Sequence, residues 1–172
     1  MFRFYPFNSP NGLLAIFIVL GRNVDDLLKL GSLTDRSKEA FLLVRSLPNI
    51  TQKSLLDVGC ASGKIPVLAK YSVGLDICIS NLKVAKGSGL RDHVVVGDAQ
   101  NLPLKTESFD VVTALDVLEH VRDDQKMINE IERVLKDGGE LVLSTPSRGF
   151  IYELFDWQSR IGIHRHYSLG TI

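Results

Sequence analysis

Short apolar runs alternate with stretches of helical spacing along most of this 172-residue chain. The runs are rich in valine, leucine and isoleucine, which favours buried strands at 54–58, 72–76, 93–97, 109–114 and 139–145. Helical spacing of apolar residues appears between them at about 63–70, 80–86 and 123–136. This alternation predicts an α/β fold of the Rossmann-like, doubly wound kind, with a mostly parallel sheet and helices on both faces.

The first 50 residues have a different pattern. The apolar run LLAIFIVL at 13–20 is shorter than the ~20 residues that a bilayer span needs. It predicts a helix or strand packed on the domain, with membrane contact as the alternative. Helical spacing recurs at 23–30 and at 35–47. We therefore expect a helical or apolar cap segment over 1–50, a core domain over 51–147 and a C-terminal segment over 148–172.

Composition and charge exclude some classes of function. Twenty basic residues balance twenty acidic ones, so nothing suggests nucleic acid as a partner. The only two cysteines, Cys60 and Cys78, lack zinc-type spacing and form no secreted disulfide framework. A signal peptide is also not indicated. Arg3 is the only basic residue before the apolar run, and no small-residue cleavage site follows the run. These features predict a cytoplasmic protein.

The stretch SLLDVGCASGKIP at 54–66 carries the first sign of a ligand. Its strand stops on Asp57 and turns through five small residues, among them Gly59 and Gly63, which allow a ligand to approach the backbone. The G-x-G-x-x-G spacing of a dinucleotide site is absent, which argues against a dinucleotide-dependent oxidoreductase. An acid ahead of the glycines suits a cationic ligand better than a diphosphate. A tight turn that binds nothing is the alternative.

Two further strands also end on acids. Asp76 lies about 20 residues past the first acid, where a carboxylate can hydrogen-bond both ribose hydroxyls of a nucleoside. Asp98 is placed to accept from an exocyclic adenine amine, with Ile77 and Ala99 offering apolar faces to the ring. The alternatives are an N-cap near Ser80 for Asp76 and a loop cap for Asp98. Together the acids fit a nucleoside that carries positive charge.

Four blocks resemble the class I S-adenosylmethionine-dependent methyltransferases, in particular the small-molecule branch called type 11. They are LLDVGCASGKIP, VGLDIC, VVVGDAQNLPLKTESFDVVTALDVLEHV and IERVLKDGGELVLSTPS, in family order and spacing. The resemblance implies S-adenosylmethionine as cofactor, S-adenosylhomocysteine as product, and a small molecule as methyl acceptor. It also makes 51–147 the cofactor-binding core.

The same resemblance implies roles for individual residues. The methionine side of the cofactor would be surrounded by residues of the first loop and of the fourth strand end, and the nucleoside by the acids above and their neighbours. The implied cofactor residues are Asp57, Gly59, Cys60, Ala61, Gly63, Asp76, Ile77, Asp98, Ala99, Leu115 and Asp116. Many relatives carry glycine where Ala61 stands. Lys136 to Gly139 would form the turn into the fifth strand.

The end of the chain departs from the family pattern. The family sheet has strand order 3-2-1-4-5 followed by an antiparallel pair, and no sequence after 147 resembles that pair. The fifth strand is then expected to be an exposed apolar edge, open to self-association. Truncation, a partner chain that covers the edge, and a reduced fold are the three explanations. The runner-up function, a cofactor-binding or partner subunit without methyl transfer, rests on this edge.

Methyl transfer from a sulfonium is an in-line displacement that depends chiefly on positioning. A base is needed only for a protonated acceptor. The candidate is His120, whose alternative is packing over the cofactor without chemistry; Glu119 is expected to be solvated and His93 structural. His164, His166 and Tyr167 are expected on the substrate side, with no metal site. Aromatic residues outside the core favour a lipophilic or aromatic acceptor, unless they merely cover the sheet.

Overall fold

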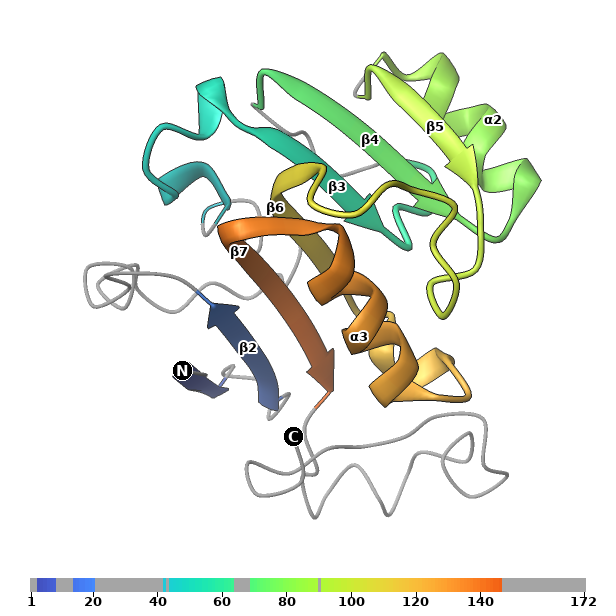
Figure 1. Ribbon diagram of the computed structural model, residues 1–172. Helices are drawn as coiled ribbons and strands as arrows, with labels where there is room; N and C mark the ends of the chain where they lie inside the picture. The colour runs from blue at the N-terminus through green and yellow to red at the C-terminus, as the bar shows by residue number, and fades with distance from the viewer. Residues whose placement is uncertain are drawn as a thin grey trace.

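One seven-stranded sheet organises the computed structural model of this chain, which describes residues 3–8, 14–20, 42, 44–63, 69–89 and 91–146 (Figure 1). The strand order across the sheet is β1-β2-β7-β6-β3-β4-β5. The strands are β1 (Arg3–Asn8), β2 (Leu14–Leu20), β3 (Ser54–Val58), β4 (Tyr71–Asp76), β5 (His93–Val96), β6 (Phe109–Leu115) and β7 (Leu135–Pro146).

The five central strands confirm the predicted order 3-2-1-4-5. Strand β3 pairs in parallel with β4 on one side and with β6 on the other, and β5 and β7 extend the sheet in parallel. Adjacent residues of a strand are fully buried on opposite faces, as with Leu55 and Leu56 of β3 and Val111 and Val112 of β6. Burial on both faces explains why these strands appear in the sequence as continuous apolar runs.

The prediction of an exposed fifth-strand edge is wrong. Strand β2 pairs antiparallel with β7, from Ala15 opposite Pro146 to Leu20 opposite Leu141, and β1 then pairs antiparallel with β2. An antiparallel pair therefore does lie beyond the fifth strand, but it comes from the N-terminal side of the core rather than from the C-terminal side. Self-association through a bare β7 edge loses its basis, because β2 takes up that edge.

The same hairpin decides between the two forms, helix or strand, that were predicted for the apolar run within the segment 1–50. Residues 3–8 and 14–20 are strands of the main sheet, so the apolar run is a sheet strand. Pro6 lies in β1, the outermost strand, where its missing N–H is tolerated. The helix predicted over 23–30 lies outside the described residues. Of the helix predicted over 35–47, the structure describes residues 42 and 44–47, and 42 and 44–46 are helical.

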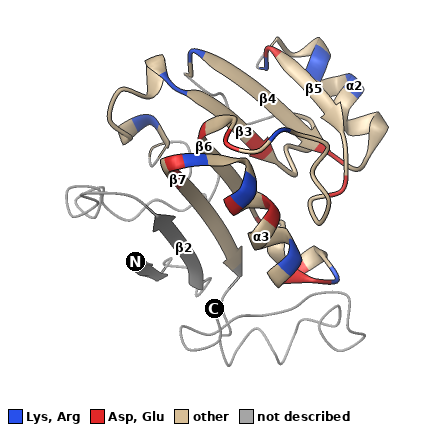
Figure 2. Cartoon of the chain, viewed as in Figure 1, with Lys and Arg blue, Asp and Glu red and all other residues tan. Residues whose placement is uncertain are grey.

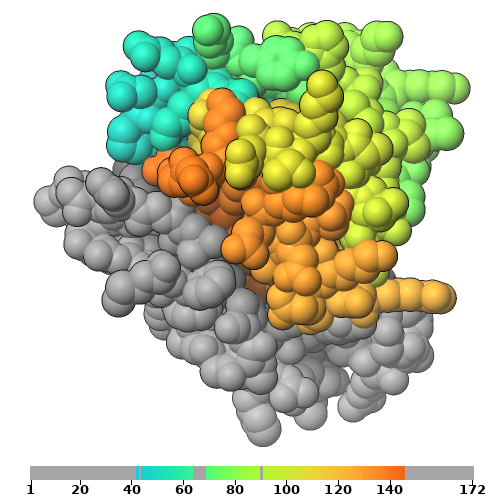
Figure 3. Space-filling view, in the orientation of Figure 1, coloured from blue at the N-terminus to red at the C-terminus, as the bar shows by residue number. Residues whose placement is uncertain are grey.

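Helices cover both faces of the sheet, as predicted. Helix α3 (Asp124–Val134) packs Met127, Ile131 and Val134 into the larger core cluster. In the space-filling view, orange atoms of this part of the chain and yellow atoms of the segment after β5 lie on the side that faces the viewer (Figure 3). On the other face, Val44, Leu47 and Ile50 form a smaller cluster with β3, β6 and β7. Ile50 belongs to the 3₁₀ helix η2 (Ile50–Gln52).

The predicted helices correspond to the observed ones where the structure describes them. Helix α2 (Ile79–Gly87) matches the prediction at 80–86, and α3 begins where the Asp123 side chain accepts from the backbone N–H of Lys126. Such an N-cap satisfies one of the free donors of the first turn. The core of the helix predicted over 63–70, residues 64–68, lies outside the described residues. Strand β7 begins at Leu135 and includes the predicted turn, with Gly138 at a φ of 72°.

Candidate functional site

The carboxyl ends of β3, β4 and β5 are tied together by hydrogen bonds. The backbone N–H of Cys60, just after β3, donates to the carbonyl of Leu75 in β4 at 3.0 Å. The next N–H, of Ala61, donates to the Asp76 carboxylate at 2.9 Å, and the N–H of Gly97 donates to the Asp76 carbonyl at 3.1 Å. Figure 2 shows acidic segments at the ends of β3 and β5. The predicted loops therefore meet at one end of the sheet, as parallel strands require.

Gly59 stands at the tightest point of the first loop. Its φ is 69°, and a Cβ built on it would lie 2.3 Å from Cγ2 of Val117, in the loop after β6. A glycine is therefore required both by the backbone conformation and by the close approach of the neighbouring loop. Gly63 is under the same two constraints, with a less severe steric overlap. Its φ is 71°, and a Cβ built on it would lie 3.2 Å from Cβ of Ala85 in α2.

Ala61 adopts a left-handed conformation, with a φ of 46°. A residue with a Cβ is strained there, and such strain is concentrated at functional sites. Relatives with glycine at this position would have no such strain. The only other non-glycine residue of the described site with a positive φ is Asp116, at 55°, directly after β6. Two of the predicted cofactor residues are thus held in costly backbone conformations.

Asp76 is the central acceptor of the site. One carboxylate oxygen accepts from Ala61 and the other accepts from the N–H of Cys78 at 2.8 Å. Each oxygen of an ionised carboxylate has a second lone pair, so both remain able to accept from a pair of ligand hydroxyls. The neighbouring Ile77 is 72% exposed, which is unusual for an isoleucine and leaves an apolar surface beside the acid.

Asp98 lies after β5 and closes its own loop. Its carboxylate accepts from the backbone N–H of Gln100 at 2.8 Å and from the Gln100 side-chain amide. These hydrogen bonds hold the pKa of Asp98 below its ordinary value, and the bond from the backbone N–H has the larger effect. The acid therefore stays ionised near neutrality. Ala99 points into the main core cluster. Asp98 therefore caps its own loop, as the alternative predicted. Its carboxylate is also exposed and can accept a further hydrogen bond from a ligand.

Asp57 is satisfied within the protein. It is buried and forms an ion pair with Arg91, whose side chain is completely buried. Its other oxygen accepts from the hydroxyl of Thr113 in β6 at 2.7 Å. Neither partner was found from the sequence, because Arg91 lies in a connection and Thr113 in the middle of an apolar strand. Asp57 therefore acts first as a buried anchor beneath the glycine loop.

The end of β6 supplies the fourth side of the site. Asp116 donates its N–H to the carbonyl of Ser144 in β7 at 2.9 Å, and the Ser144 hydroxyl donates to its carboxylate at 3.2 Å. His120 follows in the 3₁₀ helix η3 (Leu118–His120) and is exposed, while Leu115 is partly buried. The prediction that Glu119 is solvated is wrong: it is 3% exposed and accepts from the hydroxyl of Thr145.

The two cysteines are free and differ in environment. Burial, followed by the charge of Asp57, raises the pKa of the Cys60 thiol to about 12. The Sγ atom of Cys60 fits only because residue 74 is glycine, whose Cβ would lie 2.8 Å away. Cys78 is partly exposed, and the hydroxyl of Ser80, 3.0 Å from its Sγ, lowers the pKa of that thiol. Cys60 is therefore a packing residue of the loop.

Some predicted features cannot be located. His164, His166 and Tyr167 lie outside the described residues, as does the segment 148–172. Across the described part of the chain, no group of three or more His, Cys, Asp or Glu side chains is arranged to hold a metal ion. No helix within the described ranges is both long and apolar enough to cross a membrane.

The five parallel strands in the order 3-2-1-4-5, with helices on both faces, define a Rossmann-like fold, and comparison with known proteins gives the family of the chain. A family model described as "Methyltransferase domain" (Methyltransf_11) matches residues 56–143, slightly more than half of the chain. The chain belongs to this family of class I S-adenosylmethionine-dependent methyltransferases.

Individual relatives agree with this assignment. The norajmaline N-methyltransferase of Rauvolfia serpentina is 36% identical over 107 residues, covering 56% of this chain and 37% of the relative. The ubiquinone biosynthesis O-methyltransferase of Coxiella burnetii is 35% identical over 106 residues, covering 57% and 45%. The chain thus matches between about a third and a half of the length of these curated relatives. A putative methyltransferase of Bacillus halodurans superposes with a TM-score of 0.65 at 26% identity, covering 80% and 64%.

Proposed function

We propose that this chain binds S-adenosylmethionine at the carboxyl ends of β3 to β6 and transfers its methyl group to a small, lipophilic or aromatic molecule. The observation that carries the proposal is the position of Asp76. It joins the glycine loop to the end of β4 and keeps lone pairs for two ligand hydroxyls, with an exposed isoleucine beside it. Family membership supplies the identity of the nucleoside.

The residues of the site fit such a cofactor. Ile77 offers a face to the adenine ring and Asp98 an ionised carboxylate to its amine. Gly59, Cys60, Ala61 and Gly63 present a backbone without bulky side chains to the methionine part, and Leu115 and Asp116 border it from β6. Asp57 supports this loop from beneath through its ion pair.

The bound cofactor would supply a methyl group already activated by the positive charge on its sulfur. The work left to the protein is to hold donor and acceptor in line, which can lower a barrier by ~7–11 kcal/mol. His120, exposed after β6, is the candidate to accept a proton from the acceptor. His164, His166 and Tyr167 are proposed on the substrate side, and a cytoplasmic location stays a prediction from the sequence.

The runner-up function, a partner subunit without methyl transfer, has lost its motivation. It rested on an exposed β7 edge, and β2 pairs along that edge. The relatives named above include an N- and an O-methyltransferase, so the acceptor atom of this chain is left open within the proposal.

Calorimetric titration with S-adenosylhomocysteine tests the proposal. We expect micromolar binding, worth about 8 kcal/mol, that Asp76→Asn weakens at least tenfold because one acceptor and the charge are lost. The control is Asp137→Asn, a change of an exposed acid in β7, which should leave binding unaltered. A folded chain that does not bind, or an Asp76→Asn variant that binds equally well, would contradict the proposed site.

A further inference from the structure

A recess, called here the amino-end pocket, lies at the end of the sheet opposite to the proposed cofactor site. It has a volume of about 430 Å³, and the first residues of three strands border it: Tyr71 of β4, His93 of β5 and Phe109 of β6. The proposed ribose ligand Asp76 stands five residues further along β4, which is about 16 Å at 3.3 Å per residue. A molecule bound in this recess would therefore not reach the cofactor.

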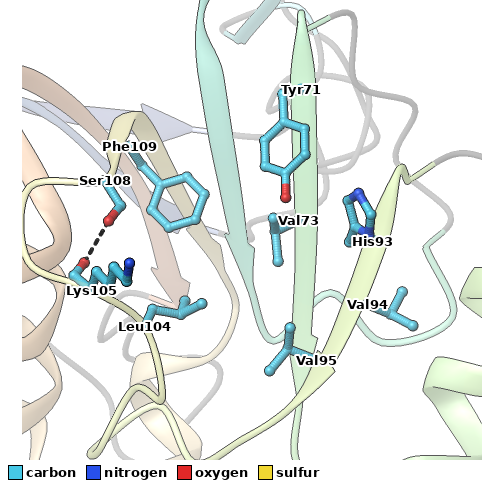
Figure 4. Close-up of a pocket in the computed structure, with 9 residues that line it drawn as sticks. All are labelled: Tyr71, Val73, His93, Val94, Val95, Leu104, Lys105, Ser108 and Phe109. Atoms are coloured by element: carbon cyan, nitrogen blue, oxygen red, sulfur yellow. Dashed lines mark hydrogen bonds between the residues drawn. The ribbon is translucent and has the colours of Figure 1, made fainter.

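The floor of this amino-end pocket belongs to the protein core. Val73 and Phe109 are buried members of the main cluster, and Val95 and Leu104 pack against it. Figure 4 shows Val73 and Val95 on the sheet between Phe109 on one side and His93 on the other. Because core packing fixes these side chains, the apolar floor is present before any ligand arrives.

The rim of the pocket combines rings with a cation. The rings of Tyr71 and His93 lie with centroids 5.2 Å apart and planes at 43°, and Tyr71 is 42% exposed. Lys105 borders the opposite side, in a segment that the Ser108 hydroxyl fixes by donating to the Lys105 carbonyl at 2.8 Å (Figure 4). A planar ring could thus lie on the floor, within reach of the ammonium group.

The residues that line the pocket carry formal charge of one sign only, from Lys105. None of the nine lining residues is acidic, and no carboxylate of the described residues forms an ion pair with Lys105. Three acids neighbour lining residues in sequence. Glu107 precedes Ser108, and Asp110, which follows Phe109, pairs with Lys136. The acid next to His93 is Asp92. Its carboxylate is held by the N–H and hydroxyl of Ser72 at 2.6 and 2.8 Å, and Ser72 alternates with Val73 and so faces the other side of β4.

We propose that the amino-end pocket binds a small planar aromatic carboxylate, with the ring on Val73, Val95 and Phe109 and the carboxylate at Lys105. The volume falls in the range of small-molecule sites, ~300–1,000 Å³. A single lysine suits one carboxylate better than a polyphosphate. The proposal is independent of methyl transfer, because the pocket shares no residue with the proposed cofactor site.

Benzoate is the probe, and benzylamine and benzyl alcohol are its charge controls. NMR titration of the whole chain should show saturable shifts of the Tyr71 and His93 ring signals with benzoate, and weaker or no shifts with the two controls. Saturating S-adenosylhomocysteine should leave these shifts unchanged. Absence of saturation in the millimolar range, equal binding of benzylamine, or displacement by S-adenosylhomocysteine would each overturn the proposal.

Substitutions separate this pocket from unspecific binding. Lys105→Gln removes the charge but keeps a polar side chain that is one atom shorter, and it should weaken benzoate binding about two- to fivefold, as expected for loss of one exposed charge pair. Lys86→Gln, a change of an exposed lysine on α2, is the matched control and should leave binding unaltered. Tyr71→Ala should weaken the binding of benzoate and of benzyl alcohol to the same extent, because it removes the aromatic ring that borders the pocket. Unchanged binding by both Lys105→Gln and Tyr71→Ala would place the ligand elsewhere.

Discussion

Asp57 and Arg91 form an ion pair inside the protein, with side chains 7% and 0% exposed. Asp57 is the second-to-last residue of β3, and Arg91 lies just before β5, the edge strand on the other side of β4. The pair therefore links β3 to the chain at the start of β5. Thr113 completes the arrangement from β6. The glycine loop of the proposed cofactor site is built directly on top of this pair.

Removing one partner should be far more costly than removing both. We expect Arg91→Met to lower the free energy of unfolding by about 3–5 kcal/mol, because it leaves a buried carboxylate without a counter-charge. The double variant Arg91→Met/Asp57→Asn should lose less than the single one. Urea unfolding followed by circular dichroism measures both. The exposed Arg45→Met serves as control and should change stability by less than ~0.5 kcal/mol.

Gly59→Ala should combine two separable costs. The left-handed backbone alone costs about 1 kcal/mol for a residue with a Cβ, and the overlap with Val117 adds about 1–3 kcal/mol. Gly89→Ala isolates the backbone cost, since its φ is 68° and no atom of the described residues lies within 4 Å of a Cβ built there.

The overlap is tested in the background of Val117→Ala. There the added cost of Gly59→Ala should fall towards that of Gly89→Ala, as measured by urea unfolding. An unchanged cost in that background would show that Val117 is not the obstacle. The same set of variants titrated with S-adenosylhomocysteine would tell whether loop shape or overall stability limits binding.

The acid stability of the chain should depend on Asp110. Burial acts to raise the pKa of this carboxyl, but hydrogen bonds from the Ser54 hydroxyl, the Lys136 ammonium and the Ser54 N–H outweigh it and lower the pKa to about 2. Because the folded-state pKa lies below the unfolded value, this stabilisation is present above about pH 4 and is lost as the pH falls through about 2.

The variant Asp110→Asn isolates this contribution. It should be less stable than the parent chain by about 1–2 kcal/mol at pH 6, a value reduced from the full shift because the carboxylate is partly exposed. The difference should shrink between pH 4 and pH 2 in urea unfolding experiments. A difference that is constant over this range would mean that the charge of Asp110 contributes nothing.

The central fold was predictable because parallel strands buried on both faces leave a distinct signal in the sequence. The runs around Leu56, Val73 and Val112 gave the right strands in the right order. The run at 13–20 was harder, because an apolar stretch of that length fits a strand or a helix equally well. Its pairing with β7 is a contact between residues more than 120 positions apart, as between Ile18 and Leu143. No local pattern encodes such a contact.

The candidate site, like the fold, was predictable from the sequence only in part. The acids at strand ends, the glycines and the resemblance located the loops correctly, because the carboxyl ends of parallel strands meet at one edge. What the sequence did not reveal was which polar groups satisfy one another. Arg91 looks like a surface residue until the fold buries it against Asp57, and Glu119 looks solvated until Thr145 contacts it. Those relations depend on three-dimensional packing alone.

The two cysteines should differ sharply in reactivity, because only a thiolate is an effective nucleophile. Cys78 is partly exposed with a lowered pKa, whereas Cys60 is buried with a pKa of about 12. At pH 8, iodoacetamide should therefore modify Cys78 and spare Cys60, as read by peptide mass spectrometry. Cys78→Ser should leave the folded chain unreactive, and urea should make both native cysteines react. Equal labelling of the two in the folded chain would show that the loop around Cys60 opens readily.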